Sequence, residues 1–150
     1  GGNEAMLGNG THNFLLDTRA TGDLTVTVRV SDGSGHSVQR QCTVTSRYPK
    51  FSAMIRTMSS AALYSDSPMT LTIRSTEYMG DYTVSYTTTS TNCRVSYDGS
   101  MLHPDSPVTL EAGQHIFTAN SSYAERTEFV FTITDIYGQS QQARASITWR

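Results

Sequence analysis

Apolar and polar positions alternate along much of the chain, with the period of two that a β-strand with one buried face produces. Gly, Pro, Asp and Ser, which favour turns, separate these stretches. The alternating apolar positions are Met69, Leu71 and Ile73; Tyr82, Val84 and Tyr86; Cys93, Val95 and Tyr97; Phe129, Phe131 and Ile133; and Ala143, Ala145, Ile147 and Trp149. Two further strands are expected at residues 51–56 and 115–119, whereas residues 59–64 (SSAALY) are expected to form a loop or a single turn. Seven or so short strands predict an all-β, antiparallel sandwich.

The chain contains an internal duplication. Residues 30–39 (VSDGSGHSVQ) and residues 133–142 (ITDIYGQSQQ) lie 103 positions apart, and this shift aligns the flanking sequence without a gap. The aligned pairs include Leu7/Leu110, Gly10/Gly113, His12/His115, Phe14/Phe117, Val26/Phe129, Val28/Phe131, Val30/Ile133, Asp32/Asp135, Gly35/Gly138 and Val44/Ile147. A match of this length indicates a true repeat rather than a coincidence.

The repeat length predicts the domain organisation. A period of 103 residues is close to the roughly 100 residues of an immunoglobulin-like sandwich and too long for a solenoid unit. We therefore expect residues 48–150 to form a complete immunoglobulin-like β-sandwich. Residues 1–47 are expected to be the C-terminal part of a preceding module, with a strand hairpin at residues 24–46.

Asp32, Gly35, Asp135 and Gly138 are predicted to be structural turn residues. An Asp at the first position of a type I turn can accept hydrogen bonds from the backbone, and a Gly at the fourth position adopts a left-handed conformation at low cost. Calcium binding by these loops is disfavoured, because neither turn has a second nearby carboxylate and calcium requires six to eight oxygens.

Composition and charge disfavour two classes of partner. The formal net charge of the 150 residues is −2, so no basic field is available to attract nucleic acid or an anionic membrane. Apolar runs are far shorter than the roughly 18 residues that span a bilayer, so membrane insertion by this segment is not expected. Ser and Thr are abundant and Lys is nearly absent, which weakly favours an extracytoplasmic protein.

No residue pattern indicates catalysis, a metal site or a cofactor. Gly33-Ser34-Gly35-His36 resembles a nucleophile motif only superficially, because Tyr137 replaces the serine in the second copy. The four histidines form no zinc-binding pattern, and the equivalence of His12 and His115 favours a shared structural hydrogen bond near the start of a strand. We therefore expect a protein that is not an enzyme and that binds no metal or cofactor.

Cys42 and Cys93 each alternate with apolar residues, so both are expected to be free, buried core thiols of different modules. A disulfide between them remains the alternative, and the redox compartment stays open. Among the tyrosines, Tyr82, Tyr86 and Tyr97 share the alternation of core positions. Tyr123, in a loop, and Tyr137, at a turn tip, are the candidate exposed contact residues.

The complete module resembles the TraQ family of conjugative-transposon proteins. The matching features are Tyr48-Pro49, the strands at residues 69–74 and 82–86, Tyr97-Asp98-Gly99, Pro104-Asp105, and above all residues 131–139 (FTITDIYGQ). This resemblance implies a small extracytoplasmic lipoprotein of Bacteroides-type bacteria with an immunoglobulin-like sandwich and no catalytic residues. The preceding partial copy leaves two interpretations open, the transfer protein itself or a surface protein built of similar modules.

The expected function is a non-enzymatic, extracytoplasmic module of a bacterial envelope protein that binds a protein partner. Contact through loops or through an exposed strand edge is expected, since an open sandwich leaves edges to be paired. The alternative is a carbohydrate-binding or adhesive surface module, which the same fold supports.

Overall fold

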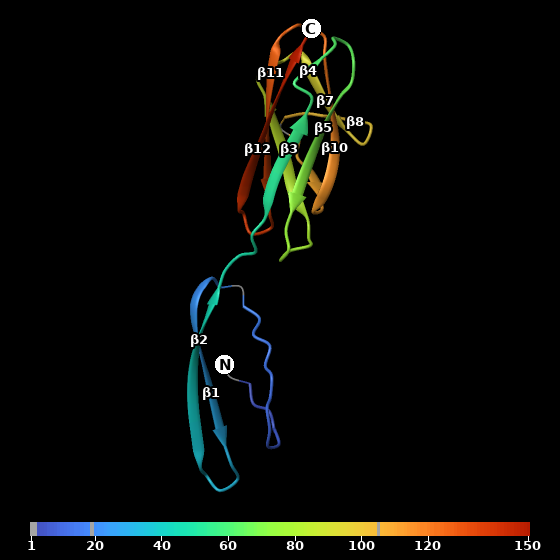
Figure 1. Cartoon of the computed structure of the whole chain (residues 1–150). Coiled ribbons are helices and arrows are strands. Elements are labelled where there is room, and N and C mark those ends of the chain that lie inside the picture. Colours follow the sequence, from blue (N-terminus) through green and yellow to red (C-terminus); the bar gives the residue numbers. More distant parts are fainter. Residues whose placement is uncertain (1–2, 19, 105) are drawn as a thin grey trace. The chain divides into compact units, whose positions relative to one another are not determined.

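The computed structural model describes residues 3–18, 20–104 and 106–150, and all regular secondary structure in these ranges is β-strand (Figure 1). The chain divides into two compact units, Gly1–Tyr48 and Pro49–Arg150. We call them the N-terminal unit and the sandwich unit and describe each by itself. Asp105, one residue of the TraQ resemblance, lies outside the described residues.

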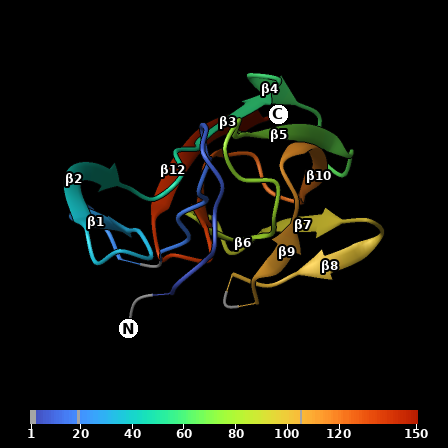
Figure 2. The same cartoon turned by 90° about the horizontal axis from the view of Figure 1, so that it is seen from below.

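In its described residues, the sandwich unit consists of two five-stranded sheets. The first has the order β3 (Ser52–Thr57), β5 (Ser67–Arg74), β10 (Gly113–Ser121), β7 (Cys93–Tyr97) and β8 (Ser100–Leu102). The second has the order β4 (Ser60–Ala61), β12 (Ser140–Trp149), β11 (Arg126–Thr134), β6 (Tyr82–Thr88) and β9 (Val108–Leu110). Seen from below, β5 and β10 lie on one side of the sandwich and β6 and β9 on the other (Figure 2). The prediction of an all-β, immunoglobulin-like sandwich is confirmed.

The core lies between the two sheets and is built from the predicted alternating positions. Its fully buried large side chains include Met69, Leu71, Ile73, Tyr82, Val95, Phe117, Phe129, Phe131, Ile133, Ile147 and Trp149. Phe117 of one sheet meets Phe131 of the other, with ring centroids 5.0 Å apart. The indole Nε1 of Trp149 donates to Oγ1 of Thr127 at 3.2 Å, which satisfies a polar group that would otherwise be costly to bury.

The sandwich unit has short strands at most of its sheet edges. β8 and β9 contain three residues each, and β4 contains two. The fourth edge strand, β3, is longer, with six residues. Short edge strands offer few unpaired backbone groups to another chain, so most edges of this unit are poor templates for strand addition.

Three short strands departed from the sequence-based expectations. The prediction of a loop or single turn at residues 59–64 was wrong in part, because Ser60 and Ala61 pair in parallel with Thr148 and Trp149. β8 and β9 were not expected either. Each of the three strands forms because a neighbouring strand of the sheet supplies its hydrogen bonds. The sequence does not predict them, because a run of two or three residues is too short to show an alternating pattern.

The N-terminal unit contains one antiparallel hairpin, formed by β1 (Gly22–Ser31) and β2 (Ser37–Ser46), and residues 3–18 contain no strand. Val26 faces Cys42 and Val28 faces Arg40 across the hairpin. In the sandwich unit, Phe129 faces Ala145 and Phe131 faces Ala143. The two hairpins therefore have the same register after a shift of 103 residues.

Cys42 is exposed, so the expectation that it is a buried core residue was wrong. Cys93 is buried, as expected, and neither cysteine forms a disulfide. The alternation that places Cys42 on the same face as Val44 is present, but no described strand of the N-terminal unit covers that face.

Candidate interaction site

The turn between β11 and β12 is organised by the Asp135 carboxylate. Its Oδ1 accepts hydrogen bonds from the backbone N–H groups of Tyr137 at 2.9 Å and Gln139 at 2.8 Å. The N–H of Gly138 donates to the Asp135 carbonyl at 3.2 Å and closes the turn. Gly138 has a φ of 84°, a left-handed conformation that a residue with a Cβ adopts only with strain. Asp135 and Gly138 therefore shape the turn.

Gln139 connects this turn to the beginning of the sandwich unit. Its side-chain amide donates one hydrogen bond to Oδ2 of Asp135 at 2.7 Å and another to the carbonyl of Pro49 at 3.0 Å. Both amide hydrogens are thus used, one toward each end of the unit's sequence. The D-x-Y-G-Q sequence consequently stabilises the tertiary structure as well as the turn.

The turn between β1 and β2 repeats the same geometry in the N-terminal unit. Oδ1 of Asp32 accepts from the N–H groups of Ser34 at 2.8 Å and His36 at 3.0 Å, and the N–H of Gly35 points to the Asp32 carbonyl at 3.4 Å. Gly35 has a φ of 87°. His36 replaces Gln139, and its Nδ1 lies 3.0 Å from Oδ2 of Asp32. The hydrogen bond from His36, together with the backbone donors, lowers the pKa of Asp32.

His12 and His115 make an equivalent hydrogen bond in the two units. Nε2 lies 2.7 Å from the carbonyl of Gly8 in the first case and 2.8 Å from the carbonyl of Glu111 in the second. A carbonyl only accepts, so Nε2 of His115 carries the proton and its Nδ1 accepts from the Tyr97 hydroxyl at 3.0 Å. Both ring nitrogens of His115 are therefore occupied by structural contacts.

Tyr137 belongs to a row of aromatic rings at one end of the sandwich unit. The ring centroids of Tyr137 and Tyr78 are 6.1 Å apart, and those of Tyr78 and Tyr82 are 5.6 Å apart. The row ends at Phe51, whose ring centroid lies 4.9 Å from that of Tyr82. Desolvation, with the nearby charge of Asp81, raises the pKa of Tyr78. Tyr137 is still exposed, so the row presents an aromatic surface at the turn tip.

Tyr123 lies at the opposite end of β11 from Tyr137, in the connection that precedes this strand. Its ring is well exposed, and its backbone N–H donates to the Ser121 hydroxyl at 3.2 Å. The structure therefore does not bring the two candidate contact tyrosines together. They belong to two separate surfaces.

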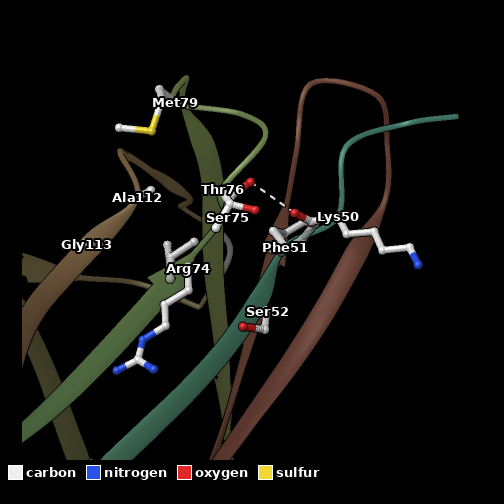
Figure 3. A pocket seen from close by; sticks show the side chains of 10 residues that line it. Lys50, Phe51, Ser52, Arg74, Ser75, Thr76, Met79, Ala112 and Gly113 are labelled. Carbon is white, nitrogen blue, oxygen red and sulfur yellow. Dashed lines mark hydrogen bonds between the residues drawn. The ribbon is translucent and has the colours of Figure 1, made fainter.

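A hollow of about 600 Å³ opens near the start of β3, the end of β5 and the beginning of β10 (Figure 3). Its lining includes Phe51 and Ile73 as apolar groups, the cations Lys50 and Arg74, and the exposed Met79. The Ser75 hydroxyl donates to the Lys50 carbonyl at 3.0 Å and joins two walls of the hollow. In Figure 3, the Lys50 and Arg74 side chains point away from each other.

A second hollow of about 400 Å³ lies on the outer face of β7 and β10. Its polar walls include Arg94, Asp66 and Asn120, and the Asn120 amide donates to Oδ1 of Asp66 at 2.9 Å. Tyr64, at the rim, is exposed and has a φ of 57°, which is uncommon for a residue other than Gly. Neither hollow is predictable from the sequence. The first is formed by segments that are far apart in the chain, and the second by outward polar residues of strands, which are ordinary and give no distinguishing signal.

Within the described ranges, no group of three or more His, Cys, Asp or Glu side chains is arranged to hold a metal ion. The same part of the chain has no helix that is long and apolar enough to cross a membrane.

Two solved structures from Bacteroides are similar to this chain. A conjugative transposon lipoprotein from Bacteroides eggerthii matches with a TM-score of 0.59 and 14% sequence identity, over 67% of this chain and 98% of that protein. A lipoprotein from Bacteroides thetaiotaomicron, solved by NMR, matches with a TM-score of 0.59 and 16% identity, over 70% of this chain and 83% of that protein. No protein-family model and no curated protein sequence matches the chain. At these identities the likeness establishes a shared fold.

Proposed function

We propose that the chain is a non-enzymatic module of a bacterial envelope protein that binds another protein outside the cytoplasm, in a role related to conjugative transfer. The observation that carries the proposal is the fold shared with the conjugative transposon lipoprotein over nearly that protein's whole length. The TraQ-like sequence of residues 131–139 adds support, because its Asp135 and Gln139 form the contacts that organise the last turn.

The end of the sandwich unit that carries Tyr137 is the proposed contact surface for this partner. It combines an exposed aromatic ring with the hollow beside Phe51 and the cations Lys50 and Arg74. Aromatic and Arg side chains dominate the energetics of many protein interfaces. No catalytic group is needed for this role.

Site-specific photocrosslinking tests the proposal. A photoreactive amino acid is introduced at Tyr137, at Met79 and, as a control on the outward face of β11, at Glu128. The protein is mixed with envelope fractions from cells that carry a conjugative transposon and from cells cured of it. We expect a crosslink to a transposon-encoded protein at Tyr137 or Met79 and none at Glu128. Identical products from both envelopes, or equal crosslinking at all three positions, would contradict the proposal.

The hollow on the outer face of β7 and β10 favours a second candidate function, carbohydrate binding. Its Asp66, Arg94 and Asn120 side chains can hydrogen-bond to hydroxyl groups beside the exposed Tyr64 ring. A glycan array tests this candidate. Saturable glycan binding that weakens in Tyr64→Asn or Arg94→Ala would show that the glycan binds in this hollow. Weakening in Tyr123→Ala would instead show that it binds at the loop that contains Tyr123. Asn tolerates a left-handed backbone, so Tyr64→Asn removes the ring without added strain.

A further inference from the structure

A row of three polar side chains crosses the sandwich unit at the hollow on the outer face of β7 and β10. Asn120 of β10 faces Arg94 of β7 in the strand register, so their side chains are neighbours on the same face of the sheet. On its other side, the Asn120 amide donates to Oδ1 of Asp66, the residue immediately before β5, at 2.9 Å. Neighbouring strands lie about 4.8 Å apart, so the row is about 10 Å long, which is enough for one sugar ring and its substituents.

Arg94 and Asp66 have complementary hydrogen-bonding capacity in this hollow. Among the described residues, no carboxylate forms an ion pair with the Arg94 guanidinium, which can only donate. The Asp66 carboxylate accepts from Asn120 and keeps further lone pairs for other donors. A ligand that satisfies both groups must offer an acceptor at one end and hydroxyl donors at the other. An anionic acceptor suits Arg94 best, because charge-assisted bonds to a guanidinium are the strongest.

The other described residues that line the hollow carry no charge. Hydroxyl groups of Ser96, Thr118 and Ser122 can donate or accept, and Met101 and Tyr64 supply apolar contact. The volume of about 400 Å³ lies in the range of small-molecule sites. This lining therefore suits a polar ligand of moderate size with a single negative group.

Tyr64 points to a ligand independently of the polar row. Its φ of 57° is a left-handed conformation that is unfavourable for a residue with a Cβ, and its N–H is held by the Ser121 carbonyl at 2.9 Å. The Tyr64 side chain is 75% exposed, so burial of the ring does not offset this strain. Strained residues of this kind cluster at ligand-binding sites. The electronegative face of the ring attracts the C–H groups of a sugar.

We propose that this hollow binds an acidic sugar of the hexuronate class. The carboxylate of the sugar pairs with Arg94, and neighbouring hydroxyl groups bind to Asp66 and Asn120. One face of the sugar ring lies against Tyr64. This inference deepens the carbohydrate-binding candidate and rests on it, and it adds the charged group that distinguishes the ligand from a neutral sugar.

Titration of the full chain with matched methyl glycosides tests the inference. Methyl glucuronide and methyl glucoside differ only in the exocyclic group, which is a carboxylate in the first and a hydroxymethyl group in the second. Methyl galacturonide and methyl galactoside form a second pair, with the opposite configuration of the hydroxyl group nearest the carboxylate. NMR titration, followed at the Asn120 side-chain amide, gives a Kd for each sugar. In at least one pair we expect the uronide to bind about tenfold more tightly than its neutral partner.

Three variants separate the charge from the ring. Arg94→Gln should bring the two sugars of the pair within about twofold of each other, because the neutral sugar never used the charge. The control Arg56→Gln removes the same charge from an exposed position of β3 in the same sheet and should leave the preference within about twofold. Tyr64→Asn tolerates the left-handed backbone and should weaken both sugars by a similar factor, about fivefold or more.

Sodium acetate serves as a further probe, because it has the carboxylate without the sugar ring. We expect it to bind about tenfold more weakly than the preferred uronide. Acetate that binds as tightly would overturn the inference and indicate a simple anion site. Equal affinities within both pairs, or a preference that persists in Arg94→Gln, would overturn the acidic sugar and leave carbohydrate binding in place.

A lack of measurable binding for all four glycosides would overturn both the inference and the carbohydrate-binding candidate. Photocrosslinking at Tyr137 does not involve this hollow, so the proposed protein-binding role is tested separately.

Discussion

Asp32 and Asp135 accept hydrogen bonds from the same two backbone positions of their turns, although only Asp135 is buried. The two carboxylates form a natural matched pair, because their local geometry is alike and their tertiary surroundings differ. Asp135 is further tied to Gln139, which reaches Pro49 at the beginning of the same unit. The Asp32 carboxylate is more than half exposed.

Asp135→Ala should destabilise the sandwich unit by about 3 kcal/mol, because buried donors lose a charged acceptor. Asp32→Ala removes the same turn contacts from the other unit and should change the unfolding free energy of the sandwich unit by less than about 0.5 kcal/mol. Urea unfolding monitored by Trp149, the chain's single tryptophan, measures both. A small loss in Asp135→Ala would show that the turn contributes little to the tertiary structure.

The Asp32 turn should respond to acid. Hydrogen bonds from His36 and from the backbone lower the folded-state pKa of Asp32 below its ordinary value of 3.8. A carboxylate with a lowered folded pKa stabilises its turn above the unfolded pKa, and this contribution is lost as the pH falls through the folded pKa. In a carboxyl NMR titration, the Asp32 midpoint should therefore lie below 3.8, and His36→Ala should raise it. If the Asp32 midpoint is the same in His36→Ala, the hydrogen bond from His36 does not lower the pKa of Asp32.

The sequence predicts those parts of the fold in which a residue pattern is repeated many times. The five alternating stretches and the 103-residue shift each repeat a constraint many times, so the strands around Leu71 and Phe131 follow from pattern alone. β4 does not, because two residues have no period and their pairing with Thr148 and Trp149 depends on where the chain returns. The sequence therefore predicts a strand where the alternating pattern is repeated, whereas the pairing of a very short strand depends on the tertiary structure.

The candidate site was less predictable than the fold. Turn geometry at Asp135 and Gly138 has a local cause in backbone chemistry, and the sequence contains that cause. The hollow near Phe51 depends on three segments that are far apart in sequence, and the Tyr64 backbone conformation has no sequence signal. Cys42 shows the converse case, because its pattern predicts burial and its actual exposure depends on whether other strands cover the hairpin.

The two cysteines should differ strongly in reactivity. Burial raises the pKa of the Cys93 thiol to about 11, whereas Cys42 is exposed. Only the thiolate reacts readily, so at pH 8 a disulfide reagent should modify one thiol per chain quickly, and Cys42→Ser should abolish this fast phase. Because the folded pKa of Cys93 is raised, its contribution to stability is present below the unfolded pKa and is lost as the pH rises toward 11. Fast modification of both thiols in the native protein would show that Cys93 is accessible.

Removal of residues 1–47 should leave residues 48–150 folded. The sandwich unit contains the buried core and both five-stranded sheets, and Trp149 and Thr127, which form its buried hydrogen bond, both lie inside it. The truncated chain should therefore keep the blue-shifted fluorescence of a buried tryptophan and a urea midpoint close to that of the full chain. The complementary fragment, residues 1–47, should lack a cooperative transition, because its hairpin has no second layer in the described residues. Exposed-tryptophan fluorescence in the truncated chain without urea would instead mean that the sandwich depends on the hairpin, and the two units would then have to be treated as one cooperative fold.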